Sequence, residues 1–240
     1  MYRYKFCPFS LISVFSWGLL ILVGCEKNEY PNKDADGNVL VSVTIGTQVW
    51  MAENLKTTKY NDGTPIPYVT DNNEWGTLTS GAYCWYDNDV SYKDYFGGLY
   101  NWFAVKSSKL CPKGWHAPTN NEWTTLENYL ISNGYNYDGT TFNNKIAKSL
   151  AAPVDWDPNF GTGSVGNDLA SNNKTGFTAY PGGYRYNDGS HRAFQSGFWW
   201  SSTEFDNGSS WYFNIDFDSP ETFRFYASKK NGTSIRCIKD

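Results

Sequence analysis

The sequence is poor in histidine and methionine, with 2 of each among its 240 residues. So few imidazoles exclude most zinc sites unless carboxylates help, and they leave little basis for a catalytic triad. The chain also lacks a cluster of basic residues, because its 20 lysines and arginines are scattered among 24 acidic residues, for a formal net charge of −4. Without a basic patch there is no strong attraction for phosphates, so we expect no nucleic-acid partner.

Aromatic residues, by contrast, make up 18% of the chain, with 11 Trp, 18 Tyr and 15 Phe. Rings and β-branched side chains therefore form most of any core, and this composition favours a β-rich domain. The length of 240 residues is enough for one large domain or two small ones.

The chain begins like an exported protein. Two basic residues precede an apolar run over residues 9–23, which ends in a glycine and a cysteine, and this order is that of a secretory signal. Residues 22–25, Leu-Val-Gly-Cys, resemble the lipobox of bacterial lipoproteins, in which the cysteine is lipidated and becomes the mature N-terminus. We therefore expect removal of residues 1–24, lipidation of Cys25, and a surface-exposed position on the outer membrane of a bacterial cell envelope.

The alternative is a non-lipidated signal or an N-terminal membrane helix in which Cys25 is incidental. Three acyl chains on one residue exceed the two signals that stable membrane anchoring requires. Residues 25–38 are almost free of apolar side chains and cannot bury enough surface to order themselves, so we expect a flexible tether. The folded domain then covers residues 39–240.

A β-hairpin is predicted at the start of this domain, because two β-branched runs, residues 39–45 and 48–51, flank Gly46-Thr47. The preceding alternation of Asp34, Asp36 and Asn38 resembles half a calcium loop. Its glycine comes one position too early and no glutamate closes it, so a turn is the favoured interpretation over a metal site.

One strong helix signal begins at Thr119. Thr119 and Glu122 have the spacing of a capping box, the apolar residues that follow recur on one face, and Asn133-Gly134 supplies a stop. A second, shorter helix is predicted over residues 142–152, ended by Pro153.

Short strands separated by Gly, Asn, Asp and Pro turns follow these helices. They are predicted at residues 176–180, 198–202, 210–217, 222–226 and 234–238. The resulting fold class is α+β, with two helices packed on short, twisted antiparallel sheets.

Six motifs, in order, make the chain similar to a known family, the Fibrobacter succinogenes major paralogous domain family, which is found in secreted proteins and lipoproteins of Bacteroidetes and Fibrobacter. They are IGTQVWMAENL at 45–55, CPKGWHAPT at 111–119, EW at 122–123, PGGYR at 181–185, WWSSTE at 199–204 and SIRC at 234–237. The resemblance implies a C-type-lectin-like fold, shared with formylglycine-generating enzymes, in which the strands at the two ends of the domain pair. Residues 39–45 should then lie beside residues 234–238. The family's molecular function is uncharacterised.

Besides Cys25, the mature chain has Cys84, Cys111 and Cys237. Export favours one disulfide, which leaves one cysteine over. The fold implied by the resemblance brings Cys111 and Cys237 together, so we expect that bridge. Cys84 stands among large rings, where a buried inert thiol is favoured over a nucleophile. It also lacks the close cysteine partner that formylglycine-generating enzymes use.

For the other motifs that could bind a cofactor or act in catalysis, we favour a purely structural role. The GTGSVG run at 161–166 matches a dinucleotide-binding pattern, but neither a strand nor a helix is predicted beside it. The pairs Asp155/Asp157 and Asp216/Asp218 could act in a glycosidase. Strand alternation, however, places Asp216 and Asp218 on the face of the strand that contacts solvent.

Calcium is considered at residues 87–89 and 206–207, whose side chains are hard oxygen ligands. The calcium-dependent sugar-binding motifs of lectins are absent. We expect no cofactor and no metal.

The aromatic surplus is the remaining functional signal, because Trp and Tyr rings stack on sugar faces while polar neighbours bind hydroxyls. The candidate ligand residues are Tyr184, Arg185, Tyr186, Asp188, Trp156 and Trp211. The alternative is that aromatic rings lie in the core, and we favour this alternative for the tryptophans inside the family motifs. We expect a monomeric, surface-anchored, non-catalytic protein that binds an extracellular glycan or protein. The alternatives are an enzyme related to the formylglycine-generating group and an anchored structural protein.

Overall fold

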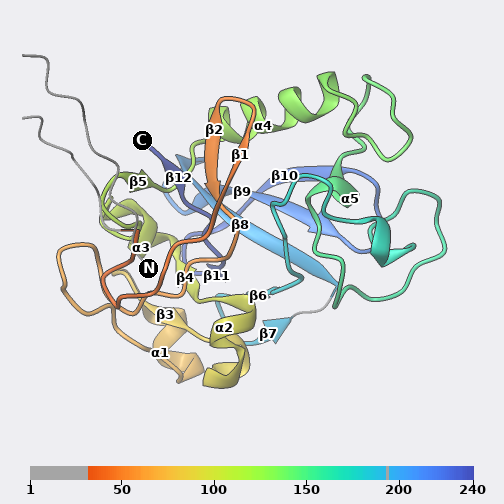
Figure 1. The fold of residues 1–240 in the computed structure, drawn as a ribbon. Helices are drawn as coiled ribbons and strands as arrows, with labels where there is room; N and C mark the ends of the chain where they lie inside the picture. The colour runs from red at the N-terminus through yellow and green to blue at the C-terminus, as the bar shows by residue number, and fades with distance from the viewer. Residues whose placement is uncertain (1–31, 193–194) are drawn as a thin grey trace, which may run out of the picture.

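The computed structural model describes residues 32–192 and 195–240 (Figure 1), so Cys25 and the predicted signal lie outside the described residues. The helices are α1 (Asn72–Thr77), α2 (Lys93–Phe96), α3 (Trp102–Lys106), α4 (Asn120–Ser132) and α5 (Ala147–Leu150), with 3-10 turns at Tyr86–Asn88, Val90–Tyr92 and Leu169–Ser171. The strands are β1 (Ser42–Ile45), β2 (Gln48–Met51), β3 (Tyr83–Cys84), β4 (Leu99–Asn101), β5 (Trp115–His116), β6 (Tyr184–Arg185), β7 (His191–Arg192), β8 (Ser196–Glu204), β9 (Ser209–Asp216), β10 (Thr222–Ser228), β11 (Gly232–Thr233) and β12 (Ile238–Lys239). The predicted α+β class is confirmed, whereas the lectin-like fold stays a prediction.

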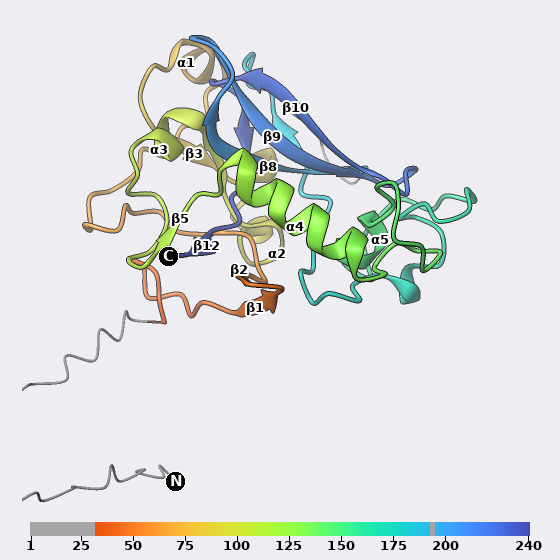
Figure 2. The ribbon, with the colours of Figure 1, turned by 90° about the horizontal axis from the view of Figure 1, so that it is seen from above.

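The longest strands form the antiparallel sheet β10-β9-β8, which crosses the centre of the molecule (Figure 1). Helix α4 runs alongside one face of this sheet (Figure 2). There Trp123 of α4 stacks on Phe213 of β9, with ring centroids 4.4 Å apart and planes 2° from parallel. Because side chains alternate along a strand, Phe198 and Tyr212 belong to the opposite face. The sheet therefore buries one face under α4 and turns the other toward β6.

The two ends of the domain meet in the sheet β1-β2-β12-β5, but the expectation that residues 39–45 lie directly beside residues 234–238 is wrong. The partner of β12 is β2 rather than β1, with Ile238 opposite Trp50. The predicted strand over residues 234–238 is wrong in its middle part. There the backbone changes partners, since Ser234 bonds to β8 while the carbonyls of Ile235 and Cys237 accept from Leu55 and Met51.

The third sheet, β3-β4-β11-β6-β7, lies on the side of the molecule away from α4 (Figure 1). Its strands are two or three residues long. Single bridges from Gly183 to Gly197 and from Ser234 to Trp199 join this part of the chain to β8. These links hold β6, which carries two predicted ligand residues, beside the long sheet.

Helix α4 confirms the capping prediction. The Thr119 hydroxyl accepts from the Glu122 amide, and the Glu122 carboxylate accepts from the Thr119 amide at 2.7 Å. The second predicted helix is wrong in length, because α5 covers only Ala147–Leu150. Asn143 has a φ of +58°, and the Asn136 amide nitrogen donates to the carbonyls of Phe142 and Asn143, so the backbone cannot continue as a helix.

The ordered domain begins earlier than the sequence predicts. Lys33 bridges Val39, and the buried Asp34 carboxylate accepts from the amides of Asp36 and Asn38, which confirms the turn. Asp36 in turn forms an ion pair with Lys59 at 3.2 Å. Part of the predicted tether is therefore fixed to the domain.

Residues 176–180 do not form the predicted strand. Thr178 has a φ of +55°, and only Ala179 bridges another segment, at Ala151. Left-handed backbone is rare for a β-branched residue and interrupts a strand.

Rings dominate the interior, as the composition predicts. Trp50, Trp75, Trp123 and Trp199 are fully buried. The Cys111–Cys237 disulfide is formed, which confirms the expected pairing, and it joins the segment before α4 to the residue that precedes the last strand. In the part of the chain that the structure describes, no helix has both the length and the apolar character needed to cross a bilayer.

Candidate functional site

Only two of the predicted ligand residues come together, in a hollow that we call the aromatic groove: Tyr184, Tyr186, Phe198 and Tyr212. The rings of Tyr184 and Tyr186 lie 4.3 Å apart between centroids, Tyr184 is edge-on to Phe198 at 4.7 Å, and Phe198 is edge-on to Tyr212 at 5.5 Å. The groove encloses about 160 Å³. Ring faces and edges are thus exposed to one small cavity at the surface.

Two polar residues complete the lining of this groove: Asn231 in the β10–β11 connection and Thr233 of β11, which is almost fully buried. Phe198 and Tyr212 were not predicted as ligand residues. The signal that could have found them is strand alternation. Phe198 and Tyr212 are each next to a ring that points into the core, Trp199 and Phe213, so their own side chains point to the other face of the sheet.

Arg185 is not a ligand residue, and its predicted exposure is wrong. Its side chain is fully buried, with the guanidinium 4.3 Å from the ring centroid of Trp75. It donates to the carbonyls of Val69, Thr70 and Gly189 at 2.6–2.9 Å. A guanidinium that satisfies these carbonyls holds two loops together and is not available to a ligand.

Trp156 is likewise interior, with 3% of its surface exposed, in the same core cluster as Trp123. The prediction failed because the surrounding Asp and Pro residues look like a surface loop, while the ring itself packs inward. Trp211 is half-buried on the α4 side of the long sheet, edge-on to Phe205 at 5.2 Å. It therefore belongs to a separate aromatic cluster, outside the groove.

Asp188 is exposed at the tip of the β6–β7 hairpin. Its carboxylate accepts from the amide and the hydroxyl of Ser190 at 2.9 Å and 2.7 Å. These hydrogen bonds lower the pKa of Asp188. The side chain thus shapes the turn near the groove.

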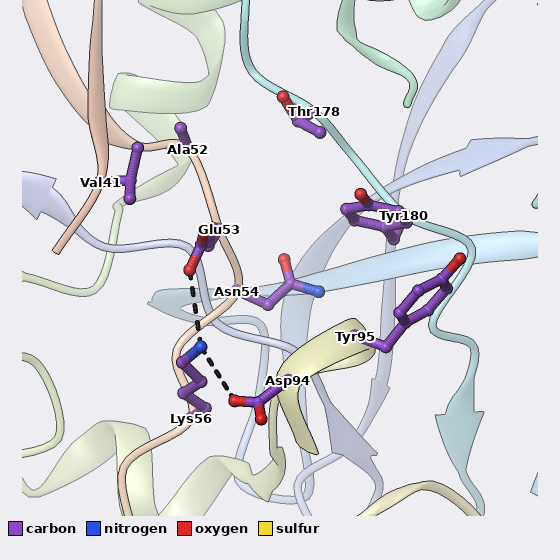
Figure 3. Close-up of a pocket in the computed structure, with 10 residues that line it drawn as sticks. Val41, Ala52, Glu53, Asn54, Lys56, Asp94, Tyr95, Thr178 and Tyr180 are labelled. Carbon is purple, nitrogen blue, oxygen red and sulfur yellow. Dashed lines mark hydrogen bonds and ion pairs between the residues drawn. The ribbon is translucent and has the colours of Figure 1, made fainter. Parts of the chain in front are cut away.

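A second hollow, which we call the polar pocket, was missed by sequence analysis altogether. It holds about 190 Å³ and is lined by Val41, Ala52, Glu53, Asn54, Lys56, Asp94, Tyr95, Gly97, Thr178 and Tyr180. Figure 3 shows its charged residues on one side and the two tyrosine rings on the other, with Asn54 between them. These residues come from three distant stretches of the chain, so no local pattern could predict the site.

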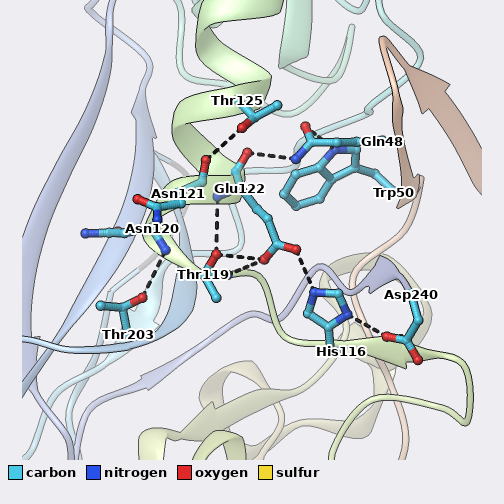
Figure 4. A network of polar contacts seen from close by, with 10 residues as sticks. All are labelled: Gln48, Trp50, His116, Thr119, Asn120, Asn121, Glu122, Thr125, Thr203 and Asp240. Atoms are coloured by element: carbon cyan, nitrogen blue, oxygen red, sulfur yellow. Dashed lines mark hydrogen bonds and ion pairs between the residues drawn. The ribbon is translucent and has the colours of Figure 1, made fainter.

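His116 lies between two carboxylates (Figure 4): its Nε2 is 2.7 Å from Glu122 and its Nδ1 is 2.6 Å from Asp240. Partial burial alone would lower the pKa of His116, but the hydrogen bonds to Asp240 and Glu122 outweigh it and the pKa is raised. Because both ring nitrogens are engaged, neither is left to activate a nucleophile in this arrangement.

The other groups with chemical potential are enclosed. Cys84 is fully buried, and burial raises the pKa of its thiol to about 12. Burial also lowers the pKa of His191 to about 4, and Arg185 adds to this effect. The GTGSVG run is a loop with neither a strand before it nor an α-helix after it, as expected. Among residues 32–192 and 195–240, no group of three or more His, Cys, Asp or Glu side chains is arranged to hold a metal ion.

A family model described as the Fibrobacter succinogenes major domain matches residues 43–239. The chain belongs to this family. Neither the comparison with curated proteins nor that with solved structures gives a match. The Fibrobacter succinogenes major domain thus runs from β1 to β12, and it contains the aromatic groove and nearly all of the polar pocket. Within this domain, the motif residue Arg185 is buried and is part of the interior.

Proposed function

We propose that this protein is a lipid-anchored, non-catalytic binding protein of the bacterial outer membrane whose aromatic groove recognises an extracellular glycan. The observation that carries the proposal is the convergence of Tyr184, Tyr186, Phe198 and Tyr212 on one small surface cavity. The C–H-rich face of a sugar ring packs against aromatic faces, and side-chain amides and hydroxyls bind its hydroxyl groups. The groove offers both kinds of contact.

Anchoring through Cys25 has a geometric consequence. Asn32, where the described chain begins, is the seventh residue after Cys25. A fully extended chain of that length spans at most about 25 Å. A lipidated Cys25 would therefore hold the domain close to the membrane, where it meets cell-surface or matrix polymers.

We propose a non-catalytic function because the thiol and the imidazole that could take part in catalysis are buried or already hydrogen-bonded. A formylglycine-type mechanism needs reactive thiols, whereas Cys84 has no exposed surface and a raised pKa. His116 is not available as a general base either, because both of its nitrogens are bound to carboxylates. The competing ligand is a protein segment, which aromatic grooves also accept.

A glycan array followed by calorimetry on the full chain tests the proposal. Tyr184→Ala combined with Tyr186→Ala should weaken glycan binding at least tenfold, or about 1.4 kcal/mol. Tyr137→Ala, which removes a distant, partly exposed ring, serves as the matched control and should leave binding unchanged. Equal binding by the double variant, or no glycan bound by any form, would reject the groove, and capture of a protein partner alone would favour the competing ligand.

A further inference from the structure

We propose that the polar pocket is a second binding site, separate from the aromatic groove, and that it takes a neutral, hydroxyl-rich group such as one saccharide residue. The two hollows share no lining residue. The pocket lies between the segment after β2, helix α2 and residues 178–180 (Figure 3). The inference therefore does not depend on the groove.

One wall of the pocket consists of two tyrosine rings. Tyr95 of α2 and Tyr180 face each other with ring centroids 5.4 Å apart and planes at 46°. The Tyr95 hydroxyl donates to the Asp155 carboxylate at 2.6 Å, which fixes the orientation of a ring that is 49% exposed. A ring that is already held loses little conformational freedom when a ligand packs against it.

The opposite wall presents both acceptors and a donor. Lys56 Nζ lies 3.1 Å from the Asp94 carboxylate and 3.7 Å from that of Glu53. Both carboxylates keep much of their surface, with side-chain exposures of 84% for Asp94 and 48% for Glu53. A carboxylate has more acceptor positions than one lysine occupies, so these groups can still bind hydroxyls.

Asn54, between the two walls, is structural. Its Oδ1 accepts from Trp199 and from Arg236, and its Nδ2 donates to the Phe96 carbonyl at 2.8 Å. These bonds attach the pocket floor to the core. Gly97, with a φ of +72°, lets the end of α2 approach this floor, because a Cβ there would lie 2.8 Å from the Cβ of Asn54.

The charge distribution selects the ligand class. Two carboxylates, Glu53 and Asp94, line the pocket and Asp155 holds the Tyr95 hydroxyl, while the nearby cations are Lys56 and Arg236, which is buried beneath Asn54. The pocket therefore has no excess of positive charge to attract an anionic ligand. The position an ammonium would take between Glu53 and Asp94 is already held by Lys56. An apolar ligand would leave these polar groups desolvated without partners. A polyol supplies donors for the carboxylates, an acceptor for the lysine, and C–H groups for the rings.

The experiment uses the full chain with 13C-labelled tyrosine and three named probes: cellobiose, glucuronic acid and glucosamine. At about 10 mM, ten times a Kd of about 1 mM, cellobiose should shift the Tyr95 and Tyr180 ring signals and saturate. Glucuronic acid and glucosamine should bind several-fold more weakly. No shift of either ring with cellobiose, or stronger binding of a charged probe, would overturn the proposal.

Variants separate this site from the groove. Tyr95→Ala and Tyr180→Ala should each weaken cellobiose binding at the pocket about tenfold, while Tyr95→Phe retains the ring and most of the affinity. The Tyr184→Ala/Tyr186→Ala protein should retain the Tyr95 and Tyr180 shifts. Loss of those shifts in the groove variant alone would refute a separate pocket. Retained shifts together with unchanged glycan-array binding of the groove variant would refute the groove and leave the pocket.

Discussion

Arg185 and Arg236 are both fully buried, and in the described part of the chain neither forms an ion pair with a carboxylate. Each guanidinium instead donates to a set of backbone carbonyls and lies over a ring, Trp75 for Arg185 and Phe177 for Arg236. A planar group with five donors satisfies several converging carbonyls at once. These two arginines, which belong to the family motifs, therefore link separate loops by hydrogen bonds.

Replacing Arg236 by methionine should destabilise the protein by about 3–5 kcal/mol. The substitution removes the donors to the carbonyls of Met51, Phe177 and Thr178 and to Asn54, and each buried acceptor left unpaired costs about 1–3 kcal/mol. Urea unfolding measures the change. Lys113→Met, which replaces an exposed cation by methionine, is the control, and an Arg236→Met protein as stable as this control would contradict the assignment.

Strand alternation already separates the residues of the groove from their neighbours. In Tyr184-Arg185-Tyr186 the first and third side chains share a face and the second faces the other way. The burial of Arg185 beside two half-buried tyrosines follows from this rule. The prediction that all three residues contact one ligand is therefore wrong, because neighbouring residues of a strand point to opposite faces of the sheet.

Helix α4 is the element that sequence rules describe best, since its cap, apolar face and end all follow local chemistry. Its first turn is also attached to the neighbouring strand β5 and to the C-terminal residue through His116, Glu122 and Asp240. The capping box can be predicted from four consecutive residues. The histidine bridge depends on the pairing of β12 with β5 and cannot.

The stabilisation supplied by His116 should depend on pH. The pKa of His116 is raised in the folded protein, so its contribution is complete below the ordinary value of about 6.5 and is lost as the pH rises through the raised pKa. The difference in unfolding free energy between the natural protein and His116→Gln should be at most about 1 kcal/mol, because these groups are partly exposed. It should be largest near the acid end of a series from about pH 5.5 to 9.

Chemical denaturation across this series gives the measurement. His191→Gln is the control, because the lowered pKa of His191, about 4, keeps that imidazole neutral throughout. A His116→Gln difference that is constant or grows toward alkaline pH would contradict the raised pKa.

At the scale of the whole molecule, the disulfide and the paired ends close the domain. Cys111 and Cys237 are 126 residues apart in sequence, and the bridge lies next to the β2–β12–β5 sheet. Two independent connections, one covalent and one of backbone hydrogen bonds, therefore hold the C-terminal segment. Of the two hollows, the polar pocket combines distant parts of the chain, from Val41 to Tyr180, whereas the aromatic groove is built from residues 184–233.

Reduction of the disulfide should lower the free energy of unfolding by about 3–5 kcal/mol, because it frees a loop whose closure entropy in the unfolded chain is about 4–5 kcal/mol. Urea titrations with and without dithiothreitol provide the comparison. The Cys111→Ala/Cys237→Ala protein should not respond to dithiothreitol. A change below about 1 kcal/mol on reduction of the natural protein would show that the paired strands alone hold the C-terminal segment in place.

The sequence alone determined what depends on neighbours along the chain: the hairpin around Gly46-Thr47, the start of α4 at Thr119, the ring-rich core and the α+β class. Turn preferences, capping and hydrophobic alternation act within a few residues, so they are visible without a structure. Only the tertiary structure decided that Arg185 and Trp156 are interior, that Tyr184 meets Phe198, and that Lys56 and Tyr95 share a pocket. Those outcomes depend on packing between segments far apart in sequence, where burial and register, rather than local composition, fix which side chains reach the surface.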